Sequence, residues 1–342
     1  MVEVTEQLAN DSLNNDYDVV VAGGGAAGLN GALMLARSRR TVAVIDSGAP
    51  RNAPADGVHG LLARDGMPPA ELLARGRAEV RSYGGHVVSG EIIRATRTEH
   101  GFTIGLADGR SVRARRLLVT TGLTDELPDI AGLRERWGRD VVHCPYCHGW
   151  EVRDRAIGLL ATGPMAMHQV QLFRQLSGDV VFFTHDGPEP TAEDTERLAA
   201  RGIRVVTGKV IAVETAGDGI TGLRLADGTV VARDVVAVGT RMVARAGFLN
   251  DLGLPAIEHP TGAGRYIPAD PTGRTEVPGV WAAGNVTDIS AQVGAAAAAG
   301  AMAGAQINAD LVEEEIRTAV AARTQGVDEP ADARLADSGS GH

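Results

Sequence analysis

The segment DVVVAGGGAAG, residues 18–28, decides the fold of this chain. Residues 18–22 have the continuous apolar pattern of a buried strand, and an apolar helical pattern follows the glycines as far as about Ser38. A second buried-strand pattern, TVAVI, covers residues 41–45 and ends at Asp46. The order strand, glycine-rich turn, helix, strand predicts a βαβ unit with a G-x-G-x-x-G turn.

Each glycine of this turn has a physical reason. Gly23 permits the tight turn, Gly25 lets the backbone approach a pyrophosphate, and Gly28 allows the helix to pack closely on the strand. The helix N-terminus then faces the negative charge of the phosphates. Asp46 follows Gly28 by eighteen residues, which is where a carboxylate accepts hydrogen bonds from a ribose hydroxyl. The sequence therefore predicts a dinucleotide site.

The two cysteines of the chain, Cys144 and Cys147, form a C-x-x-C pair within HCPYCHGWE, residues 143–151. Two intervening residues allow a small reversible disulfide, and a thiolate of low pKa exchanges with a substrate thiol or disulfide. The pair therefore predicts a redox role.

Three other uses of this motif compete with a redox role. C-x-x-C-H is the attachment motif of c-type haem, which requires export, whereas residues 1–15 are acidic and lack the apolar segment of a secretory signal. A structural zinc site needs four ligands, so His143 and His148 would have to join both cysteines within six residues. C-P-Y-C also occurs in glutaredoxins, which are small single domains, and this chain has 342 residues.

Composition limits the function classes. A net charge of −10 leaves no electrostatic footprint for nucleic acid or an anionic membrane. No apolar run reaches the ~18 residues that a spanning helix needs. Two cysteines suit a reducing compartment, where such pairs are catalytic. We expect a soluble cytoplasmic protein that binds no nucleic acid, membrane or metal.

A second α/β pattern follows the cysteines, and hairpin turns are expected at 107–109 and 226–228. The predicted fold class is α/β, with two Rossmann-like nucleotide-binding domains, the second inserted into the first. The expected division is a flexible N-terminus at 1–15, a dinucleotide domain at 16–124 plus 245–318, an inserted domain at 125–244 and a disordered tail at 319–342.

The order of the dinucleotide turn, LVTTG at 118–122, the C-x-x-C pair and Gly284-Asn285 resembles the low-molecular-weight thioredoxin reductases over about 17–310. The resemblance implies FAD and a homodimer. It places Thr121-Gly122 beside the flavin and Gly284-Asn285 at the ribityl chain, with Asn285 where the family has Asp. It places Gln292-Val293 at the start of the helix whose N-terminus points at the flavin pyrimidine. By the same resemblance three residues after the ribose acid also line the flavin. The implied residues are Thr121, Gly122, Gly284, Asn285, Gln292, Val293, Arg51, Asn52 and His59.

The segment around the cysteines departs from those reductases, which carry an acidic proton donor where this chain has His148. The pattern C-x-x-C-H-G-x-E is similar to the dithiol oxidases that close disulfides in small natural products of the gliotoxin, holomycin and depsipeptide types. This similarity implies Cys144, Cys147 and His148 as catalytic residues, a small-molecule dithiol as substrate and dioxygen as acceptor. An imidazole pKa near 6.5 suits a base at neutral pH.

The second domain lacks several features of an NADPH site. Its turn reads ATGPMA at 161–166, where Ala161 replaces the first glycine and Pro164 removes a backbone N–H. Residues 184–189 (THDGPE) contain no Arg or Lys for a 2′-phosphate. NADPH binding is therefore expected to be impaired, although Asp186 still suits the ribose of NADH. Two alternatives stay open: an NADPH-dependent thioredoxin or disulfide reductase, and a flavin-binding redox sensor without turnover.

Overall fold

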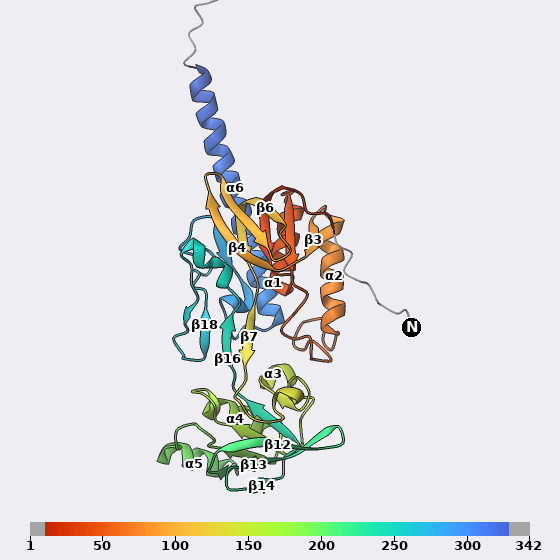
Figure 1. Cartoon of the computed structure of the whole chain (residues 1–342), viewed down its shortest axis with the longest axis vertical. Helices are drawn as coiled ribbons and strands as arrows, with labels where there is room; N and C mark the ends of the chain where they lie inside the picture. Colours follow the sequence, from red (N-terminus) through yellow and green to blue (C-terminus); the bar gives the residue numbers. More distant parts are fainter. Residues whose placement is uncertain (1–10, 328–342) are drawn as a thin grey trace, which may run out of the picture.

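The predicted βαβ unit lies at the centre of the upper body in Figure 1 of the computed structural model, which describes residues 11–327. Strand β1 runs parallel to both β2 and β6, with Val21 opposite Val44 and Leu118. The sheet order is β3-β2-β1-β6-β5-β4, and β19 pairs with β6. The elements are β1 Asp16–Ala22, α1 Ala26–Arg37, β2 Val42–Asp46, β3 His86–Ser89, β4 Ile92–Thr98, β5 Gly101–Leu106, β6 Ser111–Val119 and β19 Val280–Ala282.

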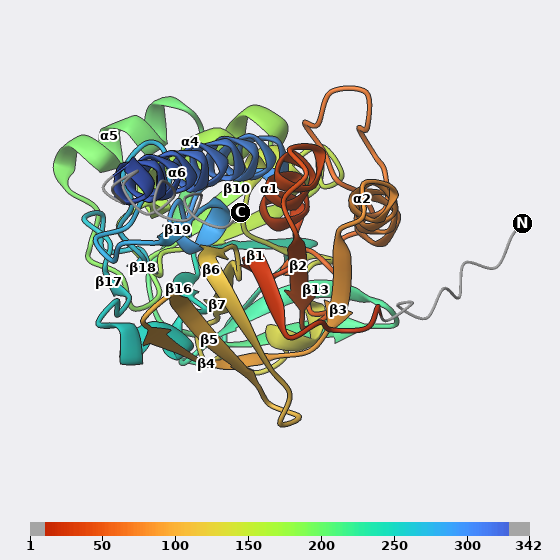
Figure 2. The same cartoon turned by 90° about the horizontal axis from the view of Figure 1, so that it is seen from above.

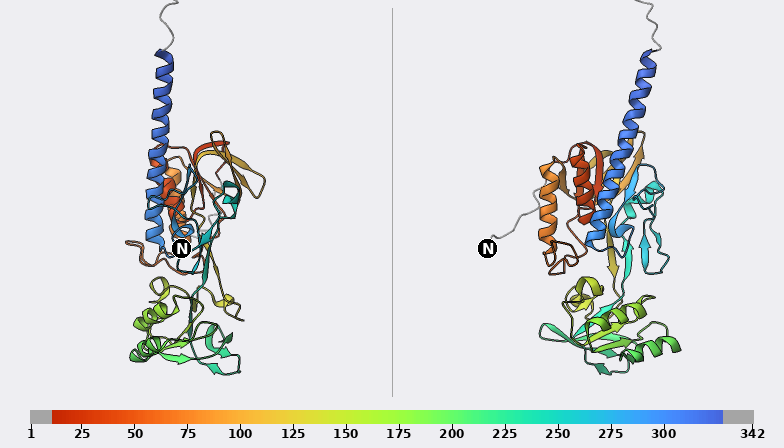
Figure 3. Two further views of the ribbon diagram at one scale, coloured as in Figure 1. Left: turned by 90° about the vertical axis from the view of Figure 1, so that its left-hand side faces the viewer. Right: turned by 180° about the vertical axis from the view of Figure 1, so that it is seen from behind.

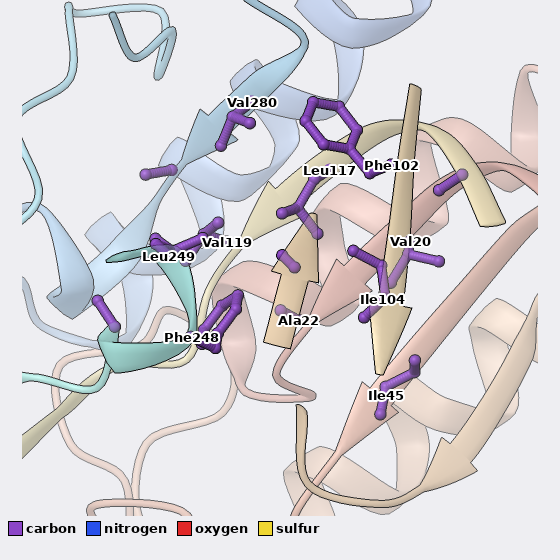
Figure 4. Packing of buried hydrophobic residues seen from close by; sticks show 14 of the residues in the cluster. Val20, Ala22, Ile45, Phe102, Ile104, Leu117, Val119, Phe248, Leu249 and Val280 are labelled. Atoms are coloured by element: carbon purple, nitrogen blue, oxygen red, sulfur yellow. The ribbon is translucent and has the colours of Figure 1, made fainter. Parts of the chain in front are cut away.

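Helices α1, α2 (Pro69–Ser82) and α6 (Val293–Val327) cover one face of this sheet, as seen from above in Figure 2. Small residues allow α1 and α6 to approach closely, because a Cβ atom added at Gly300 would lie 1.9 Å from the carbonyl oxygen of Ala27. Val19 and Val21 face these helices. Val20 points to the opposite face, into the cluster shown in Figure 4. Both faces of the strand are therefore buried, as its continuous apolar pattern predicts.

The lower body in Figure 1 contains a second parallel sheet in the order β11-β10-β9-β15-β8, with a separate three-stranded sheet β12-β13-β14 beside it. Both expected hairpins form, and Gly109 and Gly228 have the positive φ angles of tight turns, +87° and +88°. The elements are β8 Val141–Val142, α3 Pro145–His148, β9 Ile157–Leu160, α4 Ala166–Leu176, β10 Val180–Phe183, α5 Ala192–Ala200, β11 Arg204–Val206, β12 Val210–Ala216, β13 Gly219–Leu225, β14 Val230–Val231 and β15 Val235–Val238.

Two short antiparallel strands connect the bodies, β7 (Leu123–Glu126) and β16 (Arg241–Ala244). The chain enters the lower body after β7 and returns through β16, so the second Rossmann-like unit is inserted into the first and the predicted fold class is confirmed. The domain limits at 124/125 and 244/245 stay predictions; they fall within β7 and directly after β16. The elements around this linker are β17 Ile257–Glu258, β18 Gly264–Tyr266 and the 3₁₀ helices η1 Arg134–Arg136, η2 Gly247–Leu252 and η3 Gly284–Val286.

The described parts of the two predicted tails are more ordered than the sequence suggested. Asp11 accepts hydrogen bonds from Arg81 Nε at 2.8 Å and from the backbone N–H of Val87 at 2.7 Å. Helix α6 continues to Val327 and projects beyond the upper body (Figure 3), because its alanine-rich sequence favours helix past residue 318. The rest of the predicted tails, 1–10 and 328–342, lies outside the described residues. No helix within 11–327, α6 included, is long and apolar enough to cross a membrane.

Candidate active site

A single cleft with a volume of about 1680 Å³ is lined by residues from both bodies. Pockets of roughly 300–1,000 Å³ hold a drug-sized ligand, so this cleft has room for a dinucleotide and a further small molecule. All the predicted site residues except Gly28 line it, namely Gly23, Gly25, Asp46, Arg51, Asn52, His59, Thr121, Gly122, Cys144, Cys147, His148, Gly284, Asn285, Gln292 and Val293.

The glycine turn has the shape that a pyrophosphate requires. Gly23 has a φ of +101°, and a Cβ atom there would lie 2.6 Å from the carbonyl oxygen of Thr120. Gly28 packs against the back of the turn, since a Cβ atom at Gly28 would lie 1.9 Å from the carbonyl oxygen of Gly23. Gly25 faces open space, with no atom within 4 Å of an added Cβ. The turn therefore leaves a free cradle at Gly25 in front of the N-terminus of α1.

The carboxylate of Asp46 lies beside this turn and is held in place. A Cβ atom at Gly24 would lie 2.6 Å from Asp46 Oδ2. Asp46 Oδ2 also accepts a hydrogen bond from Arg77 Nη2 of α2 at 3.1 Å, and Oδ1 accepts from the N–H of Gly48 at 3.3 Å. The carboxylate thus stands at the end of β2 next to the cradle, as the binding of a ribose diol requires.

Asn285 orders the turn that leads into α6. Its Nδ2 donates to the carbonyl oxygens of Asp288 at 3.0 Å and Ala291 at 2.9 Å. These bonds place Gln292 and Val293 at the cleft, where α6 begins. On the opposite strand edge, Thr121 donates through Oγ1 to the carbonyl oxygen of Arg245 at 2.6 Å. Gly122 follows Thr121, and no atom lies within 4 Å of the position that a Cβ atom at Gly122 would take. These residues surround the part of the cleft beyond the glycine turn.

The two cysteines lie at α3, and they are not joined by a disulfide. Cys144 caps the helix, and its Sγ accepts a hydrogen bond from the N–H of Cys147 at 3.2 Å. The hydrogen bond from the Cys147 thiol lowers the pKa of Cys144 to about 7, against the effect of burial. The same bond, made to Cys144, raises the pKa of Cys147. The reduced pair therefore loses its first proton from Cys144 near neutral pH.

His148 follows the pair and is half-buried. Burial lowers the pKa of His148 below its ordinary value; the charge of His59 acts in the same direction, while Glu151 and Asp56 oppose it. The imidazole is therefore neutral at pH 7 and able to accept a proton. The neighbouring His143 is tied to the end of β15, with Nδ1 at 3.1 Å from the carbonyl oxygen of Val238.

The loop between β2 and α2 carries residues that the resemblance assigns to the flavin, and their side chains contact the linker and the lower body. Arg51 donates two hydrogen bonds to the carboxylate of Asp125 in β7, at 2.6 and 2.7 Å. Thr240 Oγ1 donates to the same carboxylate at 2.6 Å. His59 Nε2 lies 3.4 Å from Glu151 Oε1. Sequence reasoning missed Asp125 and Thr240, which belong to no motif.

The second nucleotide turn differs from the first. Pro164 stands just before α4, and Thr162 Oγ1 donates to the carbonyl oxygen of Gly239 at 2.7 Å. The fold brings a cation, Lys209, next to the stretch 184–189, which itself contains no Arg or Lys. Lys209 Nζ lies 2.9 Å from Asp186 Oδ2. This is a surface ion pair, since both side chains are more than half exposed, and the Lys209 charge is directed at Asp186. Within residues 11–327 no three His, Cys, Asp or Glu side chains gather as a metal site.

Comparisons with known proteins agree with this geometry. Thioredoxin reductase tcpT of Claviceps purpurea is 32% identical over 80% of this chain and 88% of that protein. Thioredoxin reductase sirT of Leptosphaeria maculans is 30% identical over 79% and 86%, respectively. The crystal structure of HlmI has a TM-score of 0.86 and 45% identity, and it covers 93% of this chain and 99% of its own.

The model of the pyridine nucleotide-disulphide oxidoreductases matches residues 17–326. That match spans nearly the whole described chain, including the glycine turn, the C-x-x-C helix and both linker strands. The chain therefore belongs to the pyridine nucleotide-disulphide oxidoreductase family, as an FAD-binding, thioredoxin-reductase-like thiol–disulfide oxidoreductase.

Proposed function

We propose that this protein is an FAD-dependent dithiol oxidase that closes a disulfide in a small-molecule dithiol and uses dioxygen as electron acceptor. The observation that carries the proposal is that the C-x-x-C helix and the dinucleotide cradle line one continuous cleft. The second nucleotide turn, in contrast, contains Pro164, and its nearby Lys209 is paired with Asp186. Electrons therefore enter from a dithiol more readily than from NADPH.

The residues that would hold FAD follow from the cleft. Bound FAD supplies a two-electron acceptor that dioxygen reoxidises. In each turnover two substrate S–H bonds break and one S–S bond forms, while two electrons and two protons reduce dioxygen to hydrogen peroxide. We assign the cofactor to Gly23, Gly25, Gly28, Asp46, Asn52, His59, Thr121, Gly122, Gly284, Asn285, Gln292 and Val293, and Arg51 to the cleft edge.

The cysteine pair and His148 perform the exchange with substrate. A substrate thiolate attacks Cys144 of the oxidised pair, which forms a mixed disulfide and releases Cys147 as thiolate. The second substrate thiol then displaces Cys144 and leaves as part of the product disulfide. A leaving thiolate of low pKa accelerates this second step. The hydrogen bond from the Cys147 thiol is absent while Cys147 is a thiolate, but the backbone N–H groups of Cys147 and Tyr146 and the charge of Arg51 still lower the pKa of Cys144. His148 accepts the proton of the incoming thiol.

We also propose a homodimer and a cytoplasmic location. Four large apolar side chains of α6 are exposed at spacings that place them on one side of the helix. Exposed fractions rise from 40% at Val312 to 50% at Ile316 and 60% at Val320. A second copy of the chain would bury this stripe. A chain with two cysteines, placed as a C-x-x-C pair, suits a reducing compartment.

Electron entry distinguishes the oxidase from its alternatives. Under anaerobic conditions dithiothreitol should bleach the flavin, and NADPH should do so at least about tenfold more slowly, since one missing charge-assisted contact costs about 1.5–3 kcal/mol. Air should restore the colour and yield peroxide. Cys144→Ser and Cys147→Ser should each abolish dithiol oxidation with FAD retained. Equal reduction by NADPH would replace the oxidase with a reductase, and reduction without oxygen consumption would indicate a redox sensor.

The cradle is tested by Gly25→Val. Its side chain enters open space, so the protein should fold with the melting temperature of the wild-type apoprotein while FAD is lost. Chromophore released by denaturation is quantified by HPLC. Gly163→Val is the matched control, because Gly163 also faces open space but lies in the second turn, and it should keep FAD. Retention of FAD by Gly25→Val would contradict the assignment.

The role of His148 is tested by the pH dependence of dithiol oxidation. Because burial lowers its pKa, the neutral base persists in acid, and the wild-type rate should fall only below the ordinary imidazole pKa. His148→Ala should be slower by about 10² at pH 7. Its rate should rise with pH toward about 8.5, where substrate thiols ionise unaided. His100→Ala, an exposed residue in a turn, is the control; an unchanged profile for His148→Ala would exclude the base.

The dimer is tested by light scattering at micromolar concentration, where the wild type should show twice the chain mass of 35.5 kDa. Ile316→Asp should shift the protein toward 35.5 kDa, because a charge cannot be buried unpaired in an apolar contact. Thr318→Asp, two residues along and on another side of α6, should stay dimeric. A wild type of single-chain mass would refute this proposal.

A further inference from the structure

We propose that Arg51 is a positioning residue: by holding Asp125 of the linker, it fixes the dithiol-bearing body against the FAD cleft. The inference rests on the proposed function, because a dithiol that exchanges electrons with the flavin needs this placement. The resemblance assigns Arg51 to the flavin, whereas the structure gives its guanidinium to Asp125.

The linker explains why such a contact matters. The paired strands β7 and β16 are four residues each, and the chain crosses between the bodies through them. These strands belong to a four-stranded sheet in the order β17-β18-β16-β7, in which β7 is an edge strand, so side-chain contacts to β7 help to decide how the two bodies face each other. Asp125 lies within β7, and Thr240 directly precedes β16.

The Arg51–Asp125 pair has the geometry of a strong contact. The two hydrogen bonds, 2.6 and 2.7 Å, form the bidentate fork that a guanidinium makes with a carboxylate. The side chain of Asp125 is 6% exposed, and Thr240 donates a third hydrogen bond to it. Burial alone would raise the pKa of Asp125, but the hydrogen bond and charge of Arg51 lower it. One buried carboxylate thus joins both linker crossings to the β2–α2 loop.

The same loop touches the lower body at two further points. A Cβ atom at Gly138 would lie 2.5 Å from Pro54 Cβ, so the backbone there packs on the loop. His59 lies 3.4 Å from Glu151, three residues beyond His148. Three residues of this loop therefore contact three different segments. Arg51 contacts the linker, Pro54 the start of the second sheet, and His59 the end of the dithiol segment.

The Arg51 charge also reaches the dithiol. After the hydrogen bond from Cys147 and those from two backbone N–H groups, the charge of Arg51 contributes to the lowered pKa of Cys144. It opposes the raised pKa of Cys147. Loss of Arg51 should therefore release the lower body and reduce the thiolate fraction together, while the cradle at Gly25 is unchanged.

The test uses the full-length, FAD-loaded protein with Arg51→Met, Asp125→Asn and the double variant. Arg64→Met is the matched control, since Arg64 belongs to the same loop and donates to the carbonyl oxygen of its neighbour Ala63. Two readouts are compared: small-angle scattering, and anaerobic flavin reduction by dithiothreitol beside reduction by dithionite, which needs no thiol.

Both single variants should broaden the scattering distance distribution and slow reduction by dithiothreitol about tenfold or more, because a buried partner is left uncompensated. Reduction by dithionite and FAD content should not change. The double variant should be no slower than the slower single variant, since the pair acts as one unit. Arg51→Lys should recover part of the rate, and Arg64→Met should match the wild type.

Three outcomes would overturn the inference: wild-type scattering and rate in Arg51→Met, loss of FAD from that variant, or a lowered melting temperature with no change in either readout. Failure of the wild type to be reduced by dithiothreitol would instead refute the proposed oxidase. The scattering comparison does not depend on activity, so it decides the role of the pair even then.

Discussion

The antiparallel pairing of β7 with β16 is the constraint on which the site depends. Because the chain leaves and re-enters the upper body through adjacent strands, the parallel strands of both sheets turn their carboxyl ends toward the same cleft. In open α/β sheets that edge is where ligands bind. Gly23 and Asp46 follow strands of the first sheet, and Thr162 and Gly239 follow strands of the second. A dithiol and a dinucleotide can therefore share one enclosed space.

The two nucleotide turns differ in the hydrogen-bond donors that they offer. The first turn keeps an open cradle at Gly25 in front of a helix N-terminus. Near the second nucleotide turn, Lys209 is paired with Asp186, and Pro164 removes a backbone donor from the turn itself. The two Rossmann-like domains thus present different surfaces to a phosphate group, because phosphate binding depends on unpaired hydrogen-bond donors and not on the fold alone.

Much of the fold could be predicted because its signals are local. The first βαβ unit, both hairpins and the dithiol segment were each read from fewer than about thirty consecutive residues. Helix α5 was not predicted, although Thr191 and Asp194 form a capping box that the sequence displays. Asp125 and Thr240 could not be found in this way, because their hydrogen bond joins residues 115 positions apart. Lys209 was missed for the same reason: its partner Asp186 lies across the sheet edge.

The change from the family's Asp to Asn285 shows how a departure in sequence can preserve a site. A carboxylate accepts hydrogen bonds only, so it could not donate to the carbonyl oxygens of Asp288 and Ala291 as the amide does. With Asn, the turn before α6 satisfies carbonyl oxygens of its own backbone, and Asn285 also lines the cleft. The helix start at Gln292 is then held by hydrogen bonds within the protein. The amide thus orders this turn through donor groups that a carboxylate at the same position would lack.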